Sequence, residues 1–239
     1  MNFPLAVCQL RPVPGSPSEN AETVIRVMES DEADVMVFPE MFLTGYGSPL
    51  DGLEDEAVCI GTPRFCSEGL FNSLAFLSPD GDSYYDKAHL ARFGIYSEDG
   101  FSDGQGPTMG SYHGVLFGMC ICYDVFFPEI LHGCSLRGAS VNICAAASAV
   151  QSKRFLDTVL PARALENVTY LAYANNIGAM NDCGMHGCSR ILNPFGDVIS
   201  GCGTEERIAI ADIDLEALED ARDVRQHLEN YRTDVDWGV

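Results

Sequence analysis

The sequence predicts a layered domain of helices and strands, of the α/β or α+β class. Short apolar runs alternate along the chain with segments whose apolar residues recur at helical spacing. The composition is that of a globular protein, because 46% of the 239 residues are hydrophobic and 21% are charged. No internal repeat or linker divides the pattern, so we expect a single domain over residues 1–239.

Strands are predicted where a short apolar run lies between turn residues. The clearest pair flanks residues 79–82, Pro-Asp-Gly-Asp, whose turn chemistry predicts a β-hairpin. Residues 44–64 are rich in Gly, Pro and Asp and are expected to be mostly loop. The runs that predict strands are 5–9, 35–38, 71–77, 83–87, 114–121, 141–147, 170–177, 189–193, 198–201 and 207–213.

Helices are predicted where apolar residues recur every three or four positions. The first follows a Pro-Gly-Ser-Pro-Ser turn that can supply an N-terminal cap. Pro161 lies inside another and is expected to kink or restart it. The helix after Cys122 follows a strand directly, so strand, turn and helix form one unit. The predicted helices are 18–30, 127–137, 154–167 and 215–228.

The chain is strongly acidic. It has 35 Asp and Glu against 14 Lys and Arg, a formal charge of −21, and only two of the cations are lysines. Such a surface repels phosphate backbones and anionic lipid, so we expect neither nucleic acid nor membranes as partners. Two explanations stay open: simple solubility, or adaptation to concentrated salt that screens the self-repulsion.

Cysteine usage and the amino terminus predict a cytoplasmic protein. The chain is long enough to bury a core without disulfides, so the ten cysteines are expected to be reduced thiols. The first ten residues have no basic region and no cleavage-site pattern of a secretory signal. No apolar stretch is long enough to span a membrane.

Three reactive side chains follow apolar strands, where sheet scaffolds present functional groups. Glu40 closes the run 35–40, and a carboxylate there must be paired, hydrogen-bonded or protonated. Lys87 is a lysine in a chain that prefers arginine, which suggests a specific role for its ammonium, although on this observation alone a plain surface lysine is the favoured interpretation.

Cys122 lies at the change from strand to helix. Unpaired amides at a helix amino terminus favour the thiolate form of a cysteine, as in many nucleophilic cysteines. The alternative is a core cysteine that packs as a small apolar residue. Cys120, on the same strand, fits that alternative better.

Glu40, Lys87 and Cys122 together can supply a proton acceptor, an oxyanion partner and a nucleophile. Residues 38–46 (Phe-Pro-Glu-Met-Phe-Leu-Thr-Gly-Tyr) resemble the glutamate motif of the nitrilase, or carbon-nitrogen hydrolase, superfamily. Residues 85–90 (Tyr-Asp-Lys-Ala-His-Leu) are similar to its lysine motif, and residues 122–129 (Cys-Tyr-Asp-Val-Phe-Phe-Pro-Glu) to its nucleophile elbow. The similarity continues through 161–167 and 189–196, so it covers essentially the whole chain.

The resemblance implies an α-β-β-α sandwich that hydrolyses a small carboxylic amide to an acid and ammonia, without cofactor or metal. It implies that Cys122 attacks the carbonyl after Glu40 removes its proton, and that Lys87 and the backbone amide of Tyr123 hold the oxyanion. It also implies self-association into a homodimer or higher homo-oligomer, with small-molecule amides as substrates.

A second glutamate of the family matches Glu98, which would orient the substrate or Lys87. Asp99 and Asp103 are close enough in sequence to compete for this assignment. The 46 residues between Glu40 and Lys87 lack a helix that relatives carry there, a departure that affects the mouth of the pocket.

Several other functions stay open at this point. Nitrile or N-carbamoyl hydrolysis would use the same three residues, although Tyr123-Asp124 after the cysteine is similar to the amidase and carbamoylase branches, whereas nitrilases tend to have Trp-Glu. A Cys-His protease has no local signature. A zinc site is suggested by the close spacing of Cys183, His186 and Cys188. No fourth ligand is evident, however, and the local sequence predicts a loop. A non-catalytic binding protein on this fold is the alternative of a different class.

Overall fold

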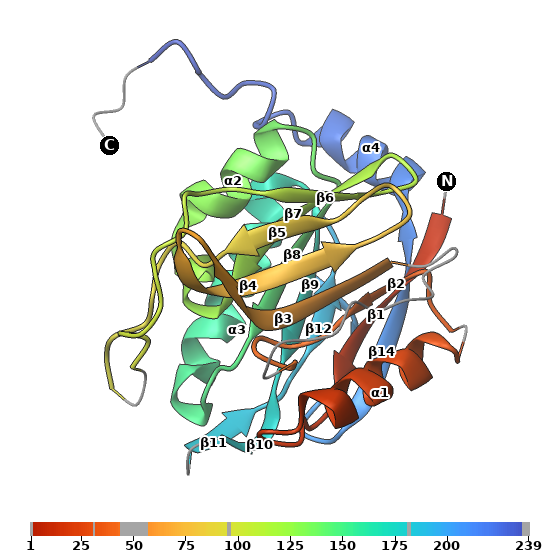
Figure 1. Ribbon diagram of the computed structural model, residues 1–239. Coiled ribbons are helices and arrows are strands. Elements are labelled where there is room, and N and C mark those ends of the chain that lie inside the picture. Colours follow the sequence, from red (N-terminus) through yellow and green to blue (C-terminus); the bar gives the residue numbers. More distant parts are fainter. Residues whose placement is uncertain (1, 31, 44–56, 95–96, 181–182, 236–239) are drawn as a thin grey trace.

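A computed structural model describes residues 2–30, 32–43, 57–94, 97–180 and 183–235. Two six-stranded sheets pack against each other, and helices cover their outer faces (Figure 1). This arrangement confirms the expected α-β-β-α sandwich.

The first sheet mixes parallel and antiparallel pairs. β2 is parallel to both of its neighbours, whereas the outer pairs are antiparallel. Helix α1 (Pro17–Met28) packs on the outer face, where Val24 and Met28 join a core cluster with Met36 and Phe38. In spatial order the strands are β14 (Arg207–Asp214), β1 (Asn2–Gln9), β2 (Val35–Val37), β3 (Ala57–Cys66), β4 (Gly69–Leu77) and β5 (Ser83–Asp86).

The second sheet has three parallel strands at its centre, β7, β8 and β9. Helix α2 (Pro128–Leu136) packs against β7, and α3 (Lys153–Asn167) packs against β9. In spatial order its strands are β13 (Val198–Gly201), β12 (Arg190–Leu192), β9 (Tyr170–Asn175), β8 (Val141–Ala146), β7 (Val115–Ile121) and β6 (Met109–Tyr112).

Four smaller elements complete the described chain. They are the 3-10 turns η1 (Cys122–Phe126) and η2 (Val150–Ser152), a two-stranded sheet of β10 (Ile177–Met180) and β11 (Cys183–His186), and helix α4 (Leu215–Val224). The core between the large sheets contains aromatic rings from both. Phe117 of the second sheet lies 5.9 Å from Phe3 and 5.1 Å from Phe76 of the first, between ring centroids. These contacts hold the two sheets in one packed layer.

Most predicted elements are confirmed, and the β4–β5 hairpin forms at the predicted turn. The loop prediction for residues 44–64 is wrong where it can be checked, because residues 57–64 belong to β3; residues 44–56 lie outside the described chain. The predicted cap of the first helix does not form, since the Ser16 side chain makes no capping hydrogen bond. Helix α3 continues through Pro161 without restarting, and residues 183–186 form β11 rather than a loop.

Gly61 explains why a Gly- and Pro-containing segment forms a strand. A Cβ atom at this position would lie within 2.6 Å of the backbone of Pro39, Glu40 and Met41. The backbone after β2 therefore passes directly against β3, and only glycine leaves room for it. This close approach places Glu40 just beyond the carboxyl end of β2, an inner strand of the first sheet.

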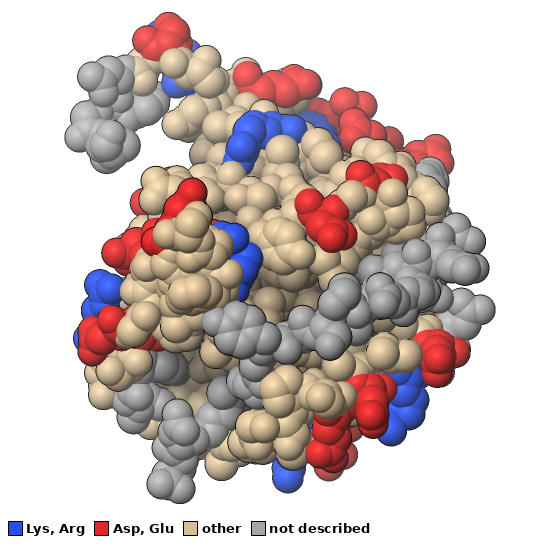
Figure 2. Space-filling model, viewed as in Figure 1, with Lys and Arg blue, Asp and Glu red and all other residues tan. Residues whose placement is uncertain are grey.

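The surface matches the acidic composition. Figure 2 shows acidic side chains spread over one face, with fewer basic ones between them. No helix in the described ranges is both long and apolar enough to cross a bilayer.

Candidate active site

Three side chains are buried where strands β2, β5 and β7 end. Lys87 directly follows β5, Cys122 directly follows β7, and Glu40 lies in the turn after β2. Their exposed fractions are 4% for Glu40, 1% for Lys87 and 8% for Cys122. The structure thus brings together the three residues that the sequence singled out, and it does so from both sheets.

Glu40 is held by four polar contacts from distant parts of the chain. Its Oε1 lies 2.8 Å from Lys87 Nζ and accepts a hydrogen bond of 2.7 Å from Asn72 Nδ2. Its Oε2 accepts a hydrogen bond of 2.8 Å from the amide of Ala147, just after β8. Asn176 Nδ2 donates to the backbone carbonyl of Glu40 at 2.8 Å. These contacts fix the carboxylate beside the end of β8, where its charge acts on Cys122 at the end of β7.

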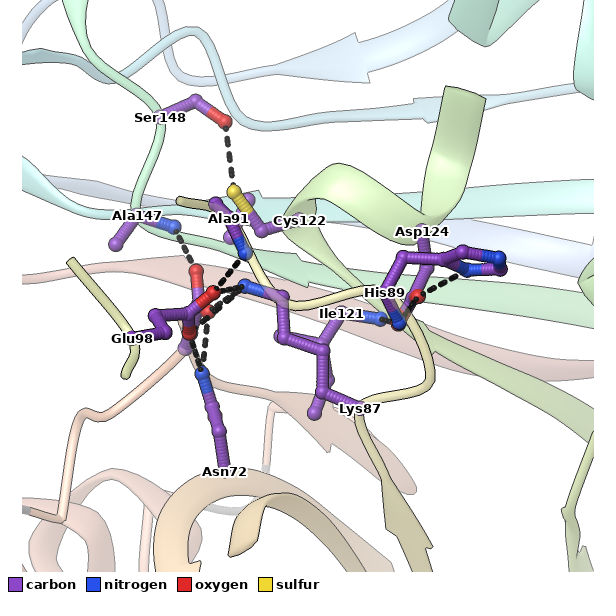
Figure 3. A network of polar contacts seen from close by, with 12 residues as sticks. Asn72, Lys87, His89, Ala91, Glu98, Ile121, Cys122, Asp124, Ala147 and Ser148 are labelled. Atoms are coloured by element: carbon purple, nitrogen blue, oxygen red, sulfur yellow. Dashed lines mark hydrogen bonds and ion pairs between the residues drawn. The ribbon is translucent and has the colours of Figure 1, made fainter. Parts of the chain in front are cut away.

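Glu98 contacts Lys87 rather than solvent. Its Oε2 lies 2.9 Å from Lys87 Nζ and accepts a hydrogen bond of 2.6 Å from the Ala91 amide. Asn72 Nδ2 also donates to Glu98 Oε1 at 2.7 Å, so one amide group contacts both carboxylates. Figure 3 shows Lys87, Glu98 and Asn72 pointing toward one another in this network.

The two competing aspartates lie elsewhere. Arg92 lies 3.4 Å from Asp99 and 3.8 Å from Asp103, and the side chains of both aspartates are more than half exposed. Of the three acidic residues in this segment, it is Glu98 that pairs with the buried lysine.

The two carboxylates keep Lys87 charged. Burial by itself lowers the pKa of Lys87, but the neighbouring charges of Glu40 and Glu98 outweigh burial and raise it above its ordinary value. The ammonium group therefore persists in a site from which water is largely excluded.

Cys122 occupies a left-handed backbone conformation, with φ of +48°, at the start of η1. Its Sγ lies 3.4 Å from Ser148 Oγ. Burial, followed by the charge of Glu40, raises the pKa of the thiol, while Lys87, the Ser148 hydroxyl and the Ala147 amide oppose the rise. The sequence predicted that a helix terminus would favour the thiolate; in the structure Cys122 begins a short 3-10 turn, α2 begins only at Pro128, and burial raises the pKa of the thiol.

Asp124 joins the segment of Lys87 to the segment of Cys122. Its Oδ2 accepts hydrogen bonds from the Tyr85 hydroxyl at 2.7 Å and the Ile121 amide at 3.2 Å. Its Oδ1 accepts one of 2.8 Å from the His89 amide and lies 2.9 Å from His89 Nδ1. Burial raises the pKa of Asp124, and these hydrogen bonds oppose that rise.

A chain of polar contacts continues from the sulfur into the second sheet. Ser148 forms a hydrogen bond with the Tyr173 hydroxyl, which lies 3.2 Å from His186 Nε2. Burial, together with Arg190 and Lys153, lowers the pKa of His186 to about 4. His186 is therefore neutral at pH 7.

Cys183, His186 and Cys188 do not meet as metal ligands. In the part of the chain that the structure describes, no three His, Cys, Asp or Glu side chains gather in metal-binding geometry. His186 instead contacts Tyr173, which explains its burial without a metal.

Sequence reasoning missed three polar residues of the site. Asp124 lies inside the motif that begins at Cys122, and its position next to two apolar residues was a usable signal. Asn72 and Ser148 gave no such signal, because they reach the site only through pairing of β4 with β5 and of β8 with β7.

Comparison with known proteins connects this site to a family. The model of the carbon-nitrogen hydrolase family matches residues 54–223, more than half of the chain. The chain is 30% identical to a 2-oxoglutaramate amidase of Bacillus subtilis, over 92% of this chain and 94% of that protein. It is 29% identical to a nitrilase of Pyrococcus abyssi, over 91% and 92% of the two chains. The crystal structure of a CN-hydrolase superfamily protein from Xanthomonas campestris has the same fold, with a TM-score of 0.87, 21% identity and coverage of 98% of this chain and 99% of that chain. The chain therefore belongs to the carbon-nitrogen hydrolase family.

Proposed function

We propose that the protein hydrolyses a small carboxylic amide to a carboxylic acid and ammonia through a thioester on Cys122. The observation that carries this proposal is the buried Glu40–Lys87 pair, 2.8 Å apart, beside the thiol. A base, a cation and a nucleophile in a largely water-free site are the groups that acyl transfer requires.

Glu40 is the general base of the first step. The sulfur of Cys122 bonds to the amide carbon as its proton moves to the Glu40 carboxylate. The raised pKa of the thiol means that this proton leaves during the attack and not before it. The charge that develops on the carbonyl oxygen is held by the Lys87 ammonium and the backbone amide of Tyr123.

The same carboxyl group completes the reaction. Glu40 returns its proton to the departing nitrogen, so the carbon–nitrogen bond breaks and ammonia leaves. Glu40 then accepts a proton from water as the water attacks the thioester carbon, and it passes this proton to the sulfur as the carbon–sulfur bond breaks, which releases the acid and restores the thiol. Glu98 and Asn72 hold Lys87 and Glu40 in place through their hydrogen bonds.

Amides are expected to react faster than nitriles. The amide route needs an acid that protonates the leaving nitrogen, and Glu40 carries that proton after the first step. The Tyr123-Asp124 pair favours the same choice. Measuring kcat/KM for matched amide and nitrile pairs tests this preference, and faster turnover of nitriles throughout would contradict it.

Trapping of the acyl-enzyme tests the reaction class. Purified protein is screened for ammonia release on amides, nitriles and N-carbamoyl compounds, at low and high salt. Hydroxylamine added during turnover is expected to give the hydroxamate of the acyl group, and mass spectrometry is expected to place the acyl adduct on Cys122. Binding of amides without any ammonia release would support the non-catalytic alternative instead.

A further inference from the structure

A hollow of about 530 Å³ opens beside the nucleophile. Two residues of its wall, Tyr123 and Ala149, directly follow Cys122 and Ser148, whose Sγ and Oγ lie 3.4 Å apart. The volume is in the range of small-molecule sites. The lining residues are Phe93, Gly94, Tyr123, Phe126, Ala149, Gln151, Ser152 and Phe155.

The wall of this hollow is mainly aromatic. The Tyr123 ring contacts two others of the wall, with ring centroids 4.8 Å from Phe93 and 6.0 Å from Phe126. Phe93 is 49% exposed and Phe155 is 63% exposed, unusually high values for phenylalanine. The polar groups among the lining residues are the side chains of Gln151 and Ser152 and the hydroxyl of Tyr123, all uncharged. Rings exposed around a hollow gain free energy when an apolar group fills it.

No lysine or arginine lines the hollow. All 14 cationic residues lie in the described part of the chain, so the undescribed residues cannot supply one. Two neighbours in sequence are engaged elsewhere: Lys153 Nζ lies 2.6 Å from Asp157, and Arg92 lies 3.4 Å from Asp99. Arg154 precedes Phe155 but is not part of the wall. A substrate carboxylate in this hollow would have no paired cation, and the formal charge of −21 would repel it further.

We propose that this hollow binds the acyl part of the substrate and selects an uncharged aromatic or branched aliphatic group. The inference rests on the proposed amidase function and names its substrate class. The proposal predicts a substrate preference different from that of the relative named 2-oxoglutaramate amidase, because 2-oxoglutaramate carries a carboxylate at the end of its acyl part.

An acyl-chain series tests the apolar preference. Ammonia release is measured for acetamide, butyramide, isovaleramide and phenylacetamide, beside the carboxylate-bearing succinamate and 2-oxoglutaramate. We expect kcat/KM to rise about threefold to fourfold for each methylene that becomes buried. The two anionic substrates are expected to react at least 100-fold more slowly than phenylacetamide. Equal or faster turnover of either anion would overturn the proposal.

A pair of matched variants places the selectivity in the hollow. Phe155→Arg introduces a cation at the rim, at a position exposed enough to tolerate it, and is expected to lower kcat/KM for phenylacetamide about tenfold and to raise it for succinamate. Phe65→Arg is the control, because Phe65 is 64% exposed and lies on β3 outside the hollow. Equal effects of the two changes would overturn the proposal. Loss of succinamate hydrolysis in Arg154→Ala would also overturn the proposal, because it would show that Arg154 already binds the substrate carboxylate in the pocket.

Binding to the Cys122→Ala variant separates the two proposals. Saturation-transfer NMR is expected to show contact of phenylacetamide with this protein, weakened by an added Phe155→Arg change and absent for succinamate. If the parent protein hydrolyses no amide but the variant shows this binding pattern, the proposed reaction is wrong and the proposed pocket is supported. If amides are hydrolysed and the pattern fails, the pocket is wrong and the reaction stands.

Discussion

At the scale of single residues, the backbone of Cys122 is the notable feature of the site. A non-glycine residue with φ of +48° has an unfavourable conformation, and such residues gather at functional sites. Here the conformation turns the chain from β7 into η1 and leaves the sulfur beside Ser148 and the Glu40–Lys87 pair.

The two cysteines of this segment are expected to respond differently to substitution. Cys122→Ala removes the proposed nucleophile and is expected to abolish ammonia release while the thermal unfolding midpoint stays close to that of the parent. Cys120→Ala is the matched control, since Cys120 is fully buried in the core, and it is expected to retain activity. The opposite result would reassign the nucleophile.

Lys87→Arg tests whether the site needs a compact ammonium group. Lys87 is 1% exposed, and the larger planar guanidinium cannot keep the same contacts with Glu40 and Glu98 in that space. We expect kcat to fall by about two orders of magnitude or more, the range seen when one oxyanion donor is removed. Lys153→Arg is the control, because Lys153 forms an exposed ion pair with Asp157, and it is expected to keep full activity. A Lys87→Arg enzyme with near-normal kcat would remove Lys87 from the mechanism.

At the scale of elements, Asp124 connects the end of β5 to the turn after β7. Asp124→Ala leaves the Tyr85 hydroxyl and the Ile121 and His89 amides without this acceptor. We expect it to lower the free energy of unfolding by about 1–3 kcal/mol, measured in urea. Tyr85→Phe removes one of these bonds and is expected to lower it by about 1 kcal/mol. Equal stability of Asp124→Ala and the parent would show that the link contributes little.

The β10–β11 hairpin is expected to make stability depend on pH through His186. Its pKa falls from 6.5 in the unfolded chain to about 4 in the fold, so below pH 6.5 the unfolded chain binds the extra proton. The stabilising contribution is complete above pH 6.5 and decreases as the pH falls toward 4. Between pH 7 and pH 4.5, the thermal unfolding midpoint of the parent is expected to fall by more than that of His186→Gln. His113→Asn, on an exposed turn, is the control and is expected to follow the parent. Parallel curves for the parent and His186→Gln would contradict this assignment.

Elements that depend on local sequence could be predicted, and those that depend on distant contacts could not. The β4–β5 hairpin follows from the turn chemistry of residues 79–82, and α2 from its spacing. Residues 57–64 of β3 were predicted to be mostly loop because Gly61 and Pro63 are typical of loops, and the packing of the backbone around Glu40 against Gly61 is a distant contact. Likewise Glu40, Lys87 and Cys122 were found at strand ends, whereas Asn72 and Ser148 became visible only through strand pairing.

At the scale of the whole molecule, the charge of −21 gives a test of salt adaptation. If repulsion among the acidic side chains is what most lowers the stability of the fold, the thermal unfolding midpoint and the activity are expected to rise with KCl up to molar concentration. At that concentration the Debye length is about 3 Å. A flat or falling midpoint would favour the solubility explanation. KCl is used because sulfate stabilises most proteins regardless of charge.

Self-association stays a prediction. Leu136 at the end of α2 is 38% exposed and Leu165 of α3 is 53% exposed, on the outer helical layer where the family resemblance places a dimer contact.

The burial of the thiols has a consequence for chemical durability. All ten cysteines are free, and seven of them are buried, including the proposed nucleophile. Peroxide and alkylating reagents attack the thiolate, and burial disfavours that form by raising the pKa of Cys8, Cys59, Cys120 and Cys122. We therefore expect inactivation in air to be slow without added reductant, because in the proposed mechanism the sulfur of Cys122 becomes reactive only while Glu40 accepts its proton. In that mechanism, the packing that keeps the thiol protonated would also protect it between turnovers.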